Sequence, residues 1–431
     1  MKQTLTKGKR YRIEGPAYIM VLEGELLALG KILRPRESLV VPKAKAMTIE
    51  VLEDSTVEVR LGDGANIVEE TEEFIPPEWK EIVERILSYE KPIKAIILGG
   101  VDSGKSTFTV FLANSAASRG LRTYVVDSDI GQSDIGVPTT IGLGRVRRPV
   151  TTLSQVRMID GYFVGTVSPA PVMHRVLVGT SILVDKAVER YKADVVIVNT
   201  SGWVTDAKAR ELKWNMILLI KPQVVVALER SNELEPVIQC LKGFKWLEII
   251  RAPALPRPRT RSREERRMLR EASYKRYLRE AKIRTFNLNK VGLMGATFSN
   301  GVVLPRERLM ELQEMLGINI IHAEETPDRL LIVTERPLKG SVAKAKELSM
   351  KFEKKVDIIY KGFEKGIVVG LWDKSGRFLG IGVVDDIDYK NKQIRVLTSI
   401  RDDSEVGMIQ LGQIRIDENG REIEKLSSYV L

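Results

Sequence analysis

The stretch Ala95-Ile-Ile-Leu-Gly-Gly-Val-Asp-Ser-Gly-Lys-Ser-Thr107 decides the fold of this 431-residue chain. An apolar run leads directly into the spacing Gly-x-x-x-x-Gly-Lys-Ser, and a stretch of helical character follows. Glycines at these places let backbone N–H groups converge on a polyphosphate without steric conflict from Cβ atoms. A strand, this loop and a helix in that order are typical of a P-loop. The sequence therefore predicts a nucleotide site, against the alternative of a glycine-rich turn with a chance lysine.

The P-loop spacing gives each polar residue a task. We expect Lys105 to place a positive charge on the β- and γ-phosphates of ATP, and Ser106 to bind Mg²⁺ through its hydroxyl. The helix that follows presents its N-terminus to the same anion. The predicted ATP-binding residues are Gly99, Gly100, Val101, Asp102, Ser103, Gly104, Lys105, Ser106 and Thr107.

The composition describes a multidomain globular chain. Hydrophobic residues make up 43% and charged residues 29%, which suits two or three domains with real cores. No run approaches the roughly 20 apolar residues that span a bilayer, and the N-terminus lacks the apolar segment of a signal peptide. A lone Cys240, expected to be a small buried residue, fits a reducing compartment. We therefore expect a cytoplasmic protein without a membrane span.

Apolar runs in the middle of the chain alternate with helical stretches. Runs such as Thr123 to Val126 and Val195 to Val198 are unbroken, as in a parallel sheet buried on both faces. The predicted fold class is α/β, a central P-loop NTPase domain with a mostly parallel sheet between helices, flanked by β-rich N-terminal and C-terminal domains. We place the boundaries at 1–75, 76–288 and 289–431. One helix is expected in the last domain, from Ser341 to Lys354 with Ser341 as N-cap.

Two acidic residues follow the strand at Thr123. Asp127 and Asp129 are two apart, so their side chains point the same way on an extended backbone and both could reach the phosphates. Asp129 lies closer to the tip, and is the better candidate to accept a proton from an attacking hydroxyl. A turn with two solvated aspartates is the alternative. The next buried strand ends in Asn199-Thr-Ser-Gly202-Trp203, where Trp203 either stacks on a nucleobase or caps the sheet.

A basic segment follows a proline-rich linker that runs from Ala252 to Pro258. Residues 251–284 contain 13 Lys or Arg against 4 Asp or Glu, which suits a polyanionic partner. From Arg261 to about Lys282 the pattern is helical, and Arg263, Arg266, Arg267 and Arg270 gather on one side. This segment, about 255–284, is either a lid that neutralises charge on a transferring phosphoryl group or a surface helix for a nucleic-acid backbone. The two roles are compatible.

These motifs in this order resemble a known family, the polynucleotide 5′-hydroxyl kinases related to the kinase subunit of the pre-mRNA cleavage factor and to pre-ribosomal RNA-processing kinases. The chain looks most like the archaeal members. The resemblance rests on the loop at 99–107, on Asp127-x-Asp129-x-Gly131-Gln132, on Thr200-x-Gly202-Trp203 and on the arginines from Arg261. It implies ATP- and Mg²⁺-dependent phosphorylation of RNA or DNA 5′-hydroxyl ends, with RNA-processing proteins as partners.

The resemblance also implies roles for individual residues. Catalysis is expected from Lys105, Asp129, Arg261 and Arg266, and the metal from Ser106 and Asp129. Substrate binding is expected from Asp127, Gln132, Thr200, Gly202, Trp203, Arg267 and Arg270. Asp127 is an extra acid in this pattern, which leaves open which aspartate is the base. The alternative function is an RNA-binding P-loop ATPase that acts as a nucleotide-dependent scaffold, although the intact Lys105, Ser106 and Asp129 argue against it. A small-molecule kinase finds no support in the basic segment and the large flanking domains.

Overall fold

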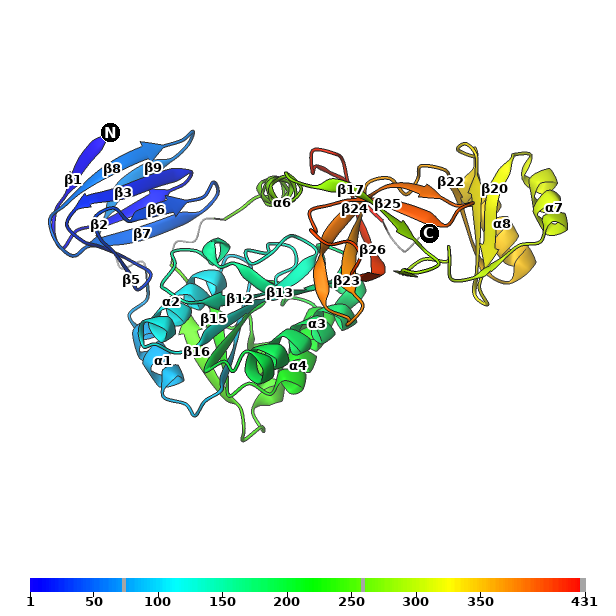
Figure 1. Cartoon of the computed structure of the whole chain (residues 1–431). Coiled ribbons are helices and arrows are strands. Elements are labelled where there is room, and N and C mark those ends of the chain that lie inside the picture. Colours follow the sequence, from blue (N-terminus) through cyan, green and yellow to red (C-terminus); the bar gives the residue numbers. More distant parts are fainter. Residues whose placement is uncertain (72–74, 257–259, 427–431) are drawn as a thin grey trace. The chain divides into compact units, whose positions relative to one another are not determined.

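The computed structural model describes residues 1–71, 75–256 and 260–426. Figure 1 shows the whole chain, coloured from the N-terminus to the C-terminus. The chain divides into two compact units. The first contains residues 1–162 and 168–267, and the second contains residues 163–167 and 268–431. The three predicted domain boundaries stay a prediction beside this division.

The N-terminal part of the first unit consists of two small antiparallel sheets, as the alternating runs predict. One sheet has the order β1 (Lys2–Leu5), β8 (Ser55–Leu61), β3 (Ala17–Glu23) and β6 (Ser38–Val41). The other has the order β5 (Lys31–Leu33), β4 (Leu26–Ala28), β7 (Ala46–Val51), β2 (Arg10–Glu14) and β9 (Asn66–Glu70). Alternate residues along β3 and β8 are buried, so these strands pack one face inward.

The central sheet of the first unit confirms the predicted α/β class. Its order is β13 (Met158–Phe163), β12 (Thr140–Val146), β11 (Thr123–Asp127), β14 (Val195–Asn199), β10 (Ile93–Gly99), β15 (Val224–Glu229) and β16 (Glu248–Pro253). The five neighbouring strands β11, β14, β10, β15 and β16 are parallel. Strand β12 pairs antiparallel with β11. Every residue of β11, β14 and β15 is buried, which explains their unbroken apolar sequences.

Helices cover both faces of this sheet (Figure 1). The helices of the first unit are α1 (Glu78–Leu87), α2 (Lys105–Ser118), α3 (Met173–Asp185), α4 (Ala207–Ile220) and α5 (Glu235–Ile238). On α2, Asn114 donates a hydrogen bond to the carbonyl of Leu29, which ties the N-terminal sheets to the P-loop helix. The basic segment forms α6 (Arg263–Tyr277), shorter than predicted because the chain enters a strand at Lys282. The predicted linker residue Pro258 lies outside the described residues.

The second unit is β-rich, as predicted, and its described residues form two sheets, two complete helices and most of α6. The larger sheet has the order β17 (Lys282–Asn287), β25 (Gln393–Thr398), β24 (Phe378–Asp388), β23 (Ile367–Asp373), β26 (Val406–Ile416) and β18 (Gly292–Met294), with β27 (Glu422–Lys425) on β26. The smaller has the order β19 (Val302–Val303), β20 (Ile320–Glu325), β21 (Arg329–Thr334) and β22 (Lys355–Tyr360). Its helices are α7 (Arg306–Leu316) and α8 (Ser341–Phe352).

Three local predictions were wrong. We expected one helix in the C-terminal part, and α7 is a second. Helix α8 is capped by Gly340 in a left-handed conformation, so Ser341 is the first helical residue and not the N-cap. Cys240 is exposed and not buried.

The order of the central sheet determines where the predicted motifs meet. Strand β10 lies between β14 and β15, and β14 lies between β10 and β11. Strand β10 leads into the P-loop, β14 ends at Asn199, and β11 ends at Asp127. The polar residues that follow them therefore share one edge of the sheet, where α/β proteins bind their ligands.

Candidate active site

The backbone of the P-loop requires glycine at two positions. A Cβ at Gly99 would lie 2.3 Å from the Ser103 hydroxyl and 2.8 Å from the Leu228 carbonyl oxygen. Gly104 has a φ of +99°, and a Cβ there would lie 2.6 Å from the side chain of Leu255. These restraints bring the loop close to β15 and start α2 directly at Lys105.

The Lys105 ammonium is buried next to its own loop. Its Nζ donates to the Gly100 carbonyl at 2.6 Å, and the residue is 7% exposed. Burial lowers the pKa of Lys105 to about 8, while Asp129 and Asp102 act in the opposite direction. The buried hydroxyl of Ser103 in the same loop has no hydrogen-bond partner among the described residues. A buried cation and an unpartnered donor are what a loop built for an anion presents.

Arginines from two other segments bind Asp102 of the P-loop. Arg266 on α6 forms an ion pair with the Asp102 carboxylate at 3.1 Å, and the backbone N–H of Arg261 lies 3.4 Å from the same oxygen. Arg230 follows β15 and donates to the Asp102 carbonyl at 2.8 Å. Sequence reasoning missed Arg230, although its position directly after a buried strand was a usable signal.

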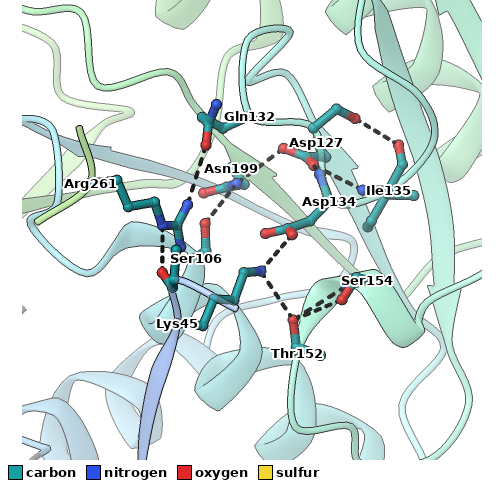
Figure 2. Close-up of polar contacts among 12 residues, drawn as sticks. Lys45, Ser106, Asp127, Gln132, Asp134, Ile135, Thr152, Ser154, Asn199 and Arg261 are labelled. Atoms are coloured by element: carbon teal, nitrogen blue, oxygen red, sulfur yellow. Dashed lines mark hydrogen bonds and ion pairs between the residues drawn. The ribbon is translucent and has the colours of Figure 1, made fainter. Parts of the chain in front are cut away.

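The Asp127 carboxylate is an anchor for the loop that follows it (Figure 2). It accepts hydrogen bonds from the backbone N–H groups of Asp134 at 2.7 Å and Ile135 at 3.0 Å, and from Asn199 Nδ2 at 3.0 Å. Burial, and then the nearby Asp134 and Asp129, raise the pKa of Asp127 to about 7. The predicted contact of Asp127 with substrate stays a prediction, and in this structure its carboxylate is held by the loop that follows it and by Asn199.

Asp129 is the acid that stays partly exposed. Its carboxylate accepts backbone hydrogen bonds from Gly131 at 3.3 Å and Gln132 at 3.1 Å. Burial raises the pKa of Asp129, and the positive charges of Lys105 and Lys213 oppose that rise. The side chain is thus held in place within the electrostatic field of the P-loop lysine.

Asn199 links Asp127 to Ser106 of the P-loop. This residue is named among the sequence motifs without a role. Its Nδ2 donates to Asp127 at 3.0 Å and lies 3.4 Å from the Ser106 hydroxyl. Its Oδ1 is buried and has no partner among the described residues. Mg²⁺ prefers hydroxyl, amide and carboxylate oxygens as ligands. The oxygens of Ser106, Asn199 and Asp129 are of these kinds, so these residues fit this ion. No group of three or more His, Cys, Asp or Glu side chains able to hold a metal occurs in the described part of the chain.

The turn after β14 is fastened from within. The Thr200 hydroxyl is buried and donates to the Ile97 carbonyl at 2.7 Å, so it ties the turn to the neighbouring strand, and its predicted role in substrate binding stays a prediction. A Cβ at Gly202 would lie 2.8 Å from Cα of Val101, which brings the turn against the P-loop. Trp203 is partly exposed, and its indole N–H donates to Asp206 at 2.6 Å.

Two segments distant in sequence reach the loop that contains Asp129 (Figure 2). Arg261 donates to the Gln132 amide oxygen at 3.3 Å and to the Ala44 carbonyl at 2.9 Å. Lys45 of the N-terminal sheets forms an ion pair with Asp134 at 2.6 Å. Lys45 and Asp134 could not be found from motifs, because they become neighbours only through the packing of the N-terminal sheets.

The arginines of α6 differ in their contacts and do not bind one common partner. Arg267 is exposed. Arg270 contacts Glu422 of its own unit through both carboxylate oxygens, at 2.5 and 2.8 Å. Substrate binding by Arg270 stays a prediction, and in this structure the largely buried Glu422 carboxylate occupies its guanidinium.

The fold and the site define a P-loop nucleotide-binding protein with an acid and an aromatic turn beside the phosphate loop. Residues 99–280 match the family described as the P-loop of mRNA cleavage and polyadenylation factor CLP1. A polyribonucleotide 5′-hydroxyl-kinase of Pyrococcus abyssi is 34% identical over 83% of this chain and 97% of its own length. A polyribonucleotide 5′-hydroxyl-kinase of Methanocaldococcus jannaschii is 32% identical over 81% of this chain and 94% of its own.

Among solved structures, the fold is similar to a structure of a wild-type Clp1p–Pcf11p complex. The TM-score is 0.64 at 13% identity, over 96% of this chain and 97% of the other. The chain belongs to the polyribonucleotide 5′-hydroxyl-kinase family, with the predicted architecture of a P-loop domain and β-rich flanks. None of the helices in the described residues is long and apolar enough to cross a membrane.

Proposed function

We propose that this chain transfers the γ-phosphate of ATP to the 5′-hydroxyl end of RNA, and that it also accepts DNA ends. The observation that supports this most is the placement of Asp129. Its carboxylate follows a strand two places from the P-loop strand, and it is coupled electrostatically to Lys105. A carboxylate at this place can accept the proton of an attacking hydroxyl, which phosphoryl transfer to an alcohol requires.

In the proposed reaction, the 5′-hydroxyl oxygen attacks the γ-phosphorus of ATP. The new P–O bond forms as the bond to the β–γ bridging oxygen breaks, and ADP leaves. Asp129 accepts the hydroxyl proton, and Lys105 neutralises charge on the phosphates. Arg261 and Arg266 lie at the Asp129 loop and at the P-loop, respectively, and we assign them to the charge that develops during transfer.

We further propose that Mg²⁺ accompanies ATP. Ser106 and Asp129 would hold it, and the buried Asn199 Oδ1, which has no partner among the described residues, would supply a further oxygen. When bound, the ion neutralises phosphate charge and orients the γ-phosphate.

The polynucleotide is assigned to the turn at 200–203 and to α6. Trp203 is partly exposed and held by Asp206, so its ring is available to stack on the terminal base. Gly202 brings this ring next to the P-loop. Arg267 is exposed and suits a phosphate of the backbone. A protein partner from RNA processing belongs to the proposal too, supported only by the fold shared with Clp1p of the Clp1p–Pcf11p complex. The cytoplasmic location stays a prediction from the sequence.

The test is a transfer assay with γ-labelled ATP, Mg²⁺ and an oligoribonucleotide that ends in a 5′-hydroxyl. A 5′-phosphorylated oligonucleotide and a free nucleoside serve as alternative acceptors. We expect label on the 5′-hydroxyl oligonucleotide alone. Label on the nucleoside would indicate a small-molecule kinase. ATP binding without transfer to any end would contradict the proposal and favour a nucleotide-dependent scaffold.

A further inference from the structure

A lysine outside every sequence motif lies buried behind the turn at 200–203. Lys213 is on the second turn of α4, and its side chain is completely buried, at 0% exposure. Its ammonium donates to the Ser201 carbonyl at 2.9 Å and to the Ser201 hydroxyl at 3.2 Å. The helix that follows the turn thus reaches back and fastens it.

No ion pair with Lys213 exists among the described residues. A buried ammonium without a carboxylate partner is unfavourable for folding, because no opposite charge offsets its desolvation. A methionine or leucine would fill the same volume without this cost. The position is therefore unfavourable for stability alone, which is a pattern typical of functional sites.

The charges around Lys213 belong to the proposed active site. Burial is the main cause that lowers the pKa of Lys213 to about 7, and the charge of Lys105 lowers it as well, whereas Asp129 acts in the opposite direction. Lys213 in turn opposes the burial-induced rise in the pKa of Asp129. Its ammonium thus acts on the acid and on the P-loop cation, although it touches neither.

Fastening Ser201 also controls the rest of the turn. The next residue, Gly202, is packed so closely against Val101 of the P-loop that a Cβ would lie 2.8 Å from that backbone. Trp203 follows and is held by Asp206, the N-cap of α4. A shift of Ser201 would therefore move Trp203 relative to the phosphate loop.

We infer that Lys213 is a positioning residue for the acceptor end of the polynucleotide. Its two hydrogen bonds to Ser201 hold the Ser201–Gly202–Trp203 turn at the P-loop. This inference rests on the proposed function for its kinetic consequences, but its effect on polynucleotide binding is independent of transfer.

The test compares Lys213→Met, which removes the bonds and the charge, with Lys213→Gln, which keeps a donor without charge. The matched control is Lys94→Met. Lys94 is a partly buried lysine of β10 that donates to the carbonyl of Ile220, the last residue of α4, at the end of the strand away from the P-loop. For each variant we would measure thermal stability, the Kd for ATP, the Kd for a labelled 5′-hydroxyl oligoribonucleotide and steady-state transfer.

We expect Lys213→Met to lower kcat/KM for the oligonucleotide roughly 10- to 100-fold and to weaken oligonucleotide binding, because small misplacements at an acceptor have effects of this size. The Kd for ATP should change less than about twofold, and Lys213→Gln should recover part of the loss. Lys94→Met should leave all kinetic values unchanged. Equal kinetics for Lys213→Met and wild type, with a lower melting temperature, would overturn the inference. If the wild type transfers no phosphate, the proposed function fails by itself, and unchanged oligonucleotide binding in Lys213→Met would then refute the positioning role.

Discussion

The two loops that follow β10 and β14 come from adjacent parallel strands, yet they are held in different ways. The P-loop is open to a ligand: Lys105 rests on a carbonyl of its own loop, and the buried Ser103 hydroxyl has no partner among the described residues. The polar groups of the turn at 200–203 already have hydrogen-bond partners within the protein. Thr200 bonds to Ile97, Ser201 to Lys213 and Trp203 to Asp206.

This difference separates two kinds of preorganisation. The P-loop leaves hydrogen-bonding groups for a polyphosphate to satisfy, so its ligand contributes much of the binding energy there. The turn presents one ring on a rigid support, and the support is made by neighbouring residues. Changes to the P-loop should therefore abolish chemistry, whereas changes to the turn should weaken the use of one substrate.

The largest effect is expected for Lys105→Ala. Loss of the buried cation at the β- and γ-phosphates should reduce transfer on the order of 10⁴-fold. Radiolabel transfer at saturating ATP measures the loss, and Lys94→Ala is a control lysine in the preceding strand. Retained activity would contradict the assignment of the P-loop as the donor site.

Asp129→Asn should lower kcat by about 10²- to 10³-fold and leave the Kd for ATP measured without Mg²⁺ near normal, because it removes the proton acceptor and a proposed Mg²⁺ ligand but no group that contacts the phosphates. Asp127→Asn is the informative comparison. Asp127 anchors the loop at 134–135, so we expect its replacement to lower stability more than it lowers kcat. A larger loss of kcat in Asp127→Asn would mean that Asp127 is the base.

The pH dependence of kcat/KM tests the same acid. Burial raises the pKa of Asp129 above its usual 3.8, so the base is fully ionised only at higher pH than an exposed aspartate. Activity should rise with pH through this shifted pKa, and the rise should be absent in Asp129→Asn. A rise that persists in the variant would assign it to another group.

Trp203→Ala should raise the KM for the oligonucleotide about 5- to 100-fold, since stacking of one base contributes roughly 1–3 kcal/mol. The Kd for ATP should stay unchanged, because the ring lies on the acceptor side. Trp203→Phe retains a stacking surface without the bond to Asp206, and should be intermediate. An unchanged KM in the alanine variant would make Trp203 a packing residue only.

ATP affinity of the wild type should decline as pH rises through about 8. Burial lowers the pKa of Lys105 to that value in the ligand-free protein, so its charge is present below pH 8 and lost above it. Calorimetric titrations between pH 7 and 9.5 measure the change. Affinity that is constant over this range would mean that ATP meets a lysine with an ordinary pKa.

The smallest effect on activity is expected for Arg270→Ala. Arg270 is paired with the buried Glu422, so its removal should destabilise the second unit by about 3–5 kcal/mol and change kcat/KM less than about twofold. Thermal unfolding and steady-state kinetics test both parts. A large rise in the KM for RNA with unchanged stability would restore Arg270 to the substrate site.

The sequence predicted the P-loop side of the site well, because a P-loop is made by its own backbone and needs glycine at fixed places. The same holds for the buried strands, since their apolar runs are unbroken. Side chains that support the turn could not be found in this way. Lys213, Asn199 and Lys45 become neighbours of the motifs only through tertiary packing, and Asp127 turned out to anchor a loop because the chain bends after Ser128.

The most direct measurement is single-turnover transfer from labelled ATP to a 5′-hydroxyl oligoribonucleotide, at increasing oligonucleotide concentration, for wild type, Lys105→Ala and Trp203→Ala. The account predicts that Trp203→Ala approaches the wild-type rate at saturating oligonucleotide, whereas Lys105→Ala stays inactive at every concentration. Equal maximal rates for Lys105→Ala and wild type, or a Trp203→Ala rate that saturation does not restore, would contradict the division into a donor loop and an acceptor turn.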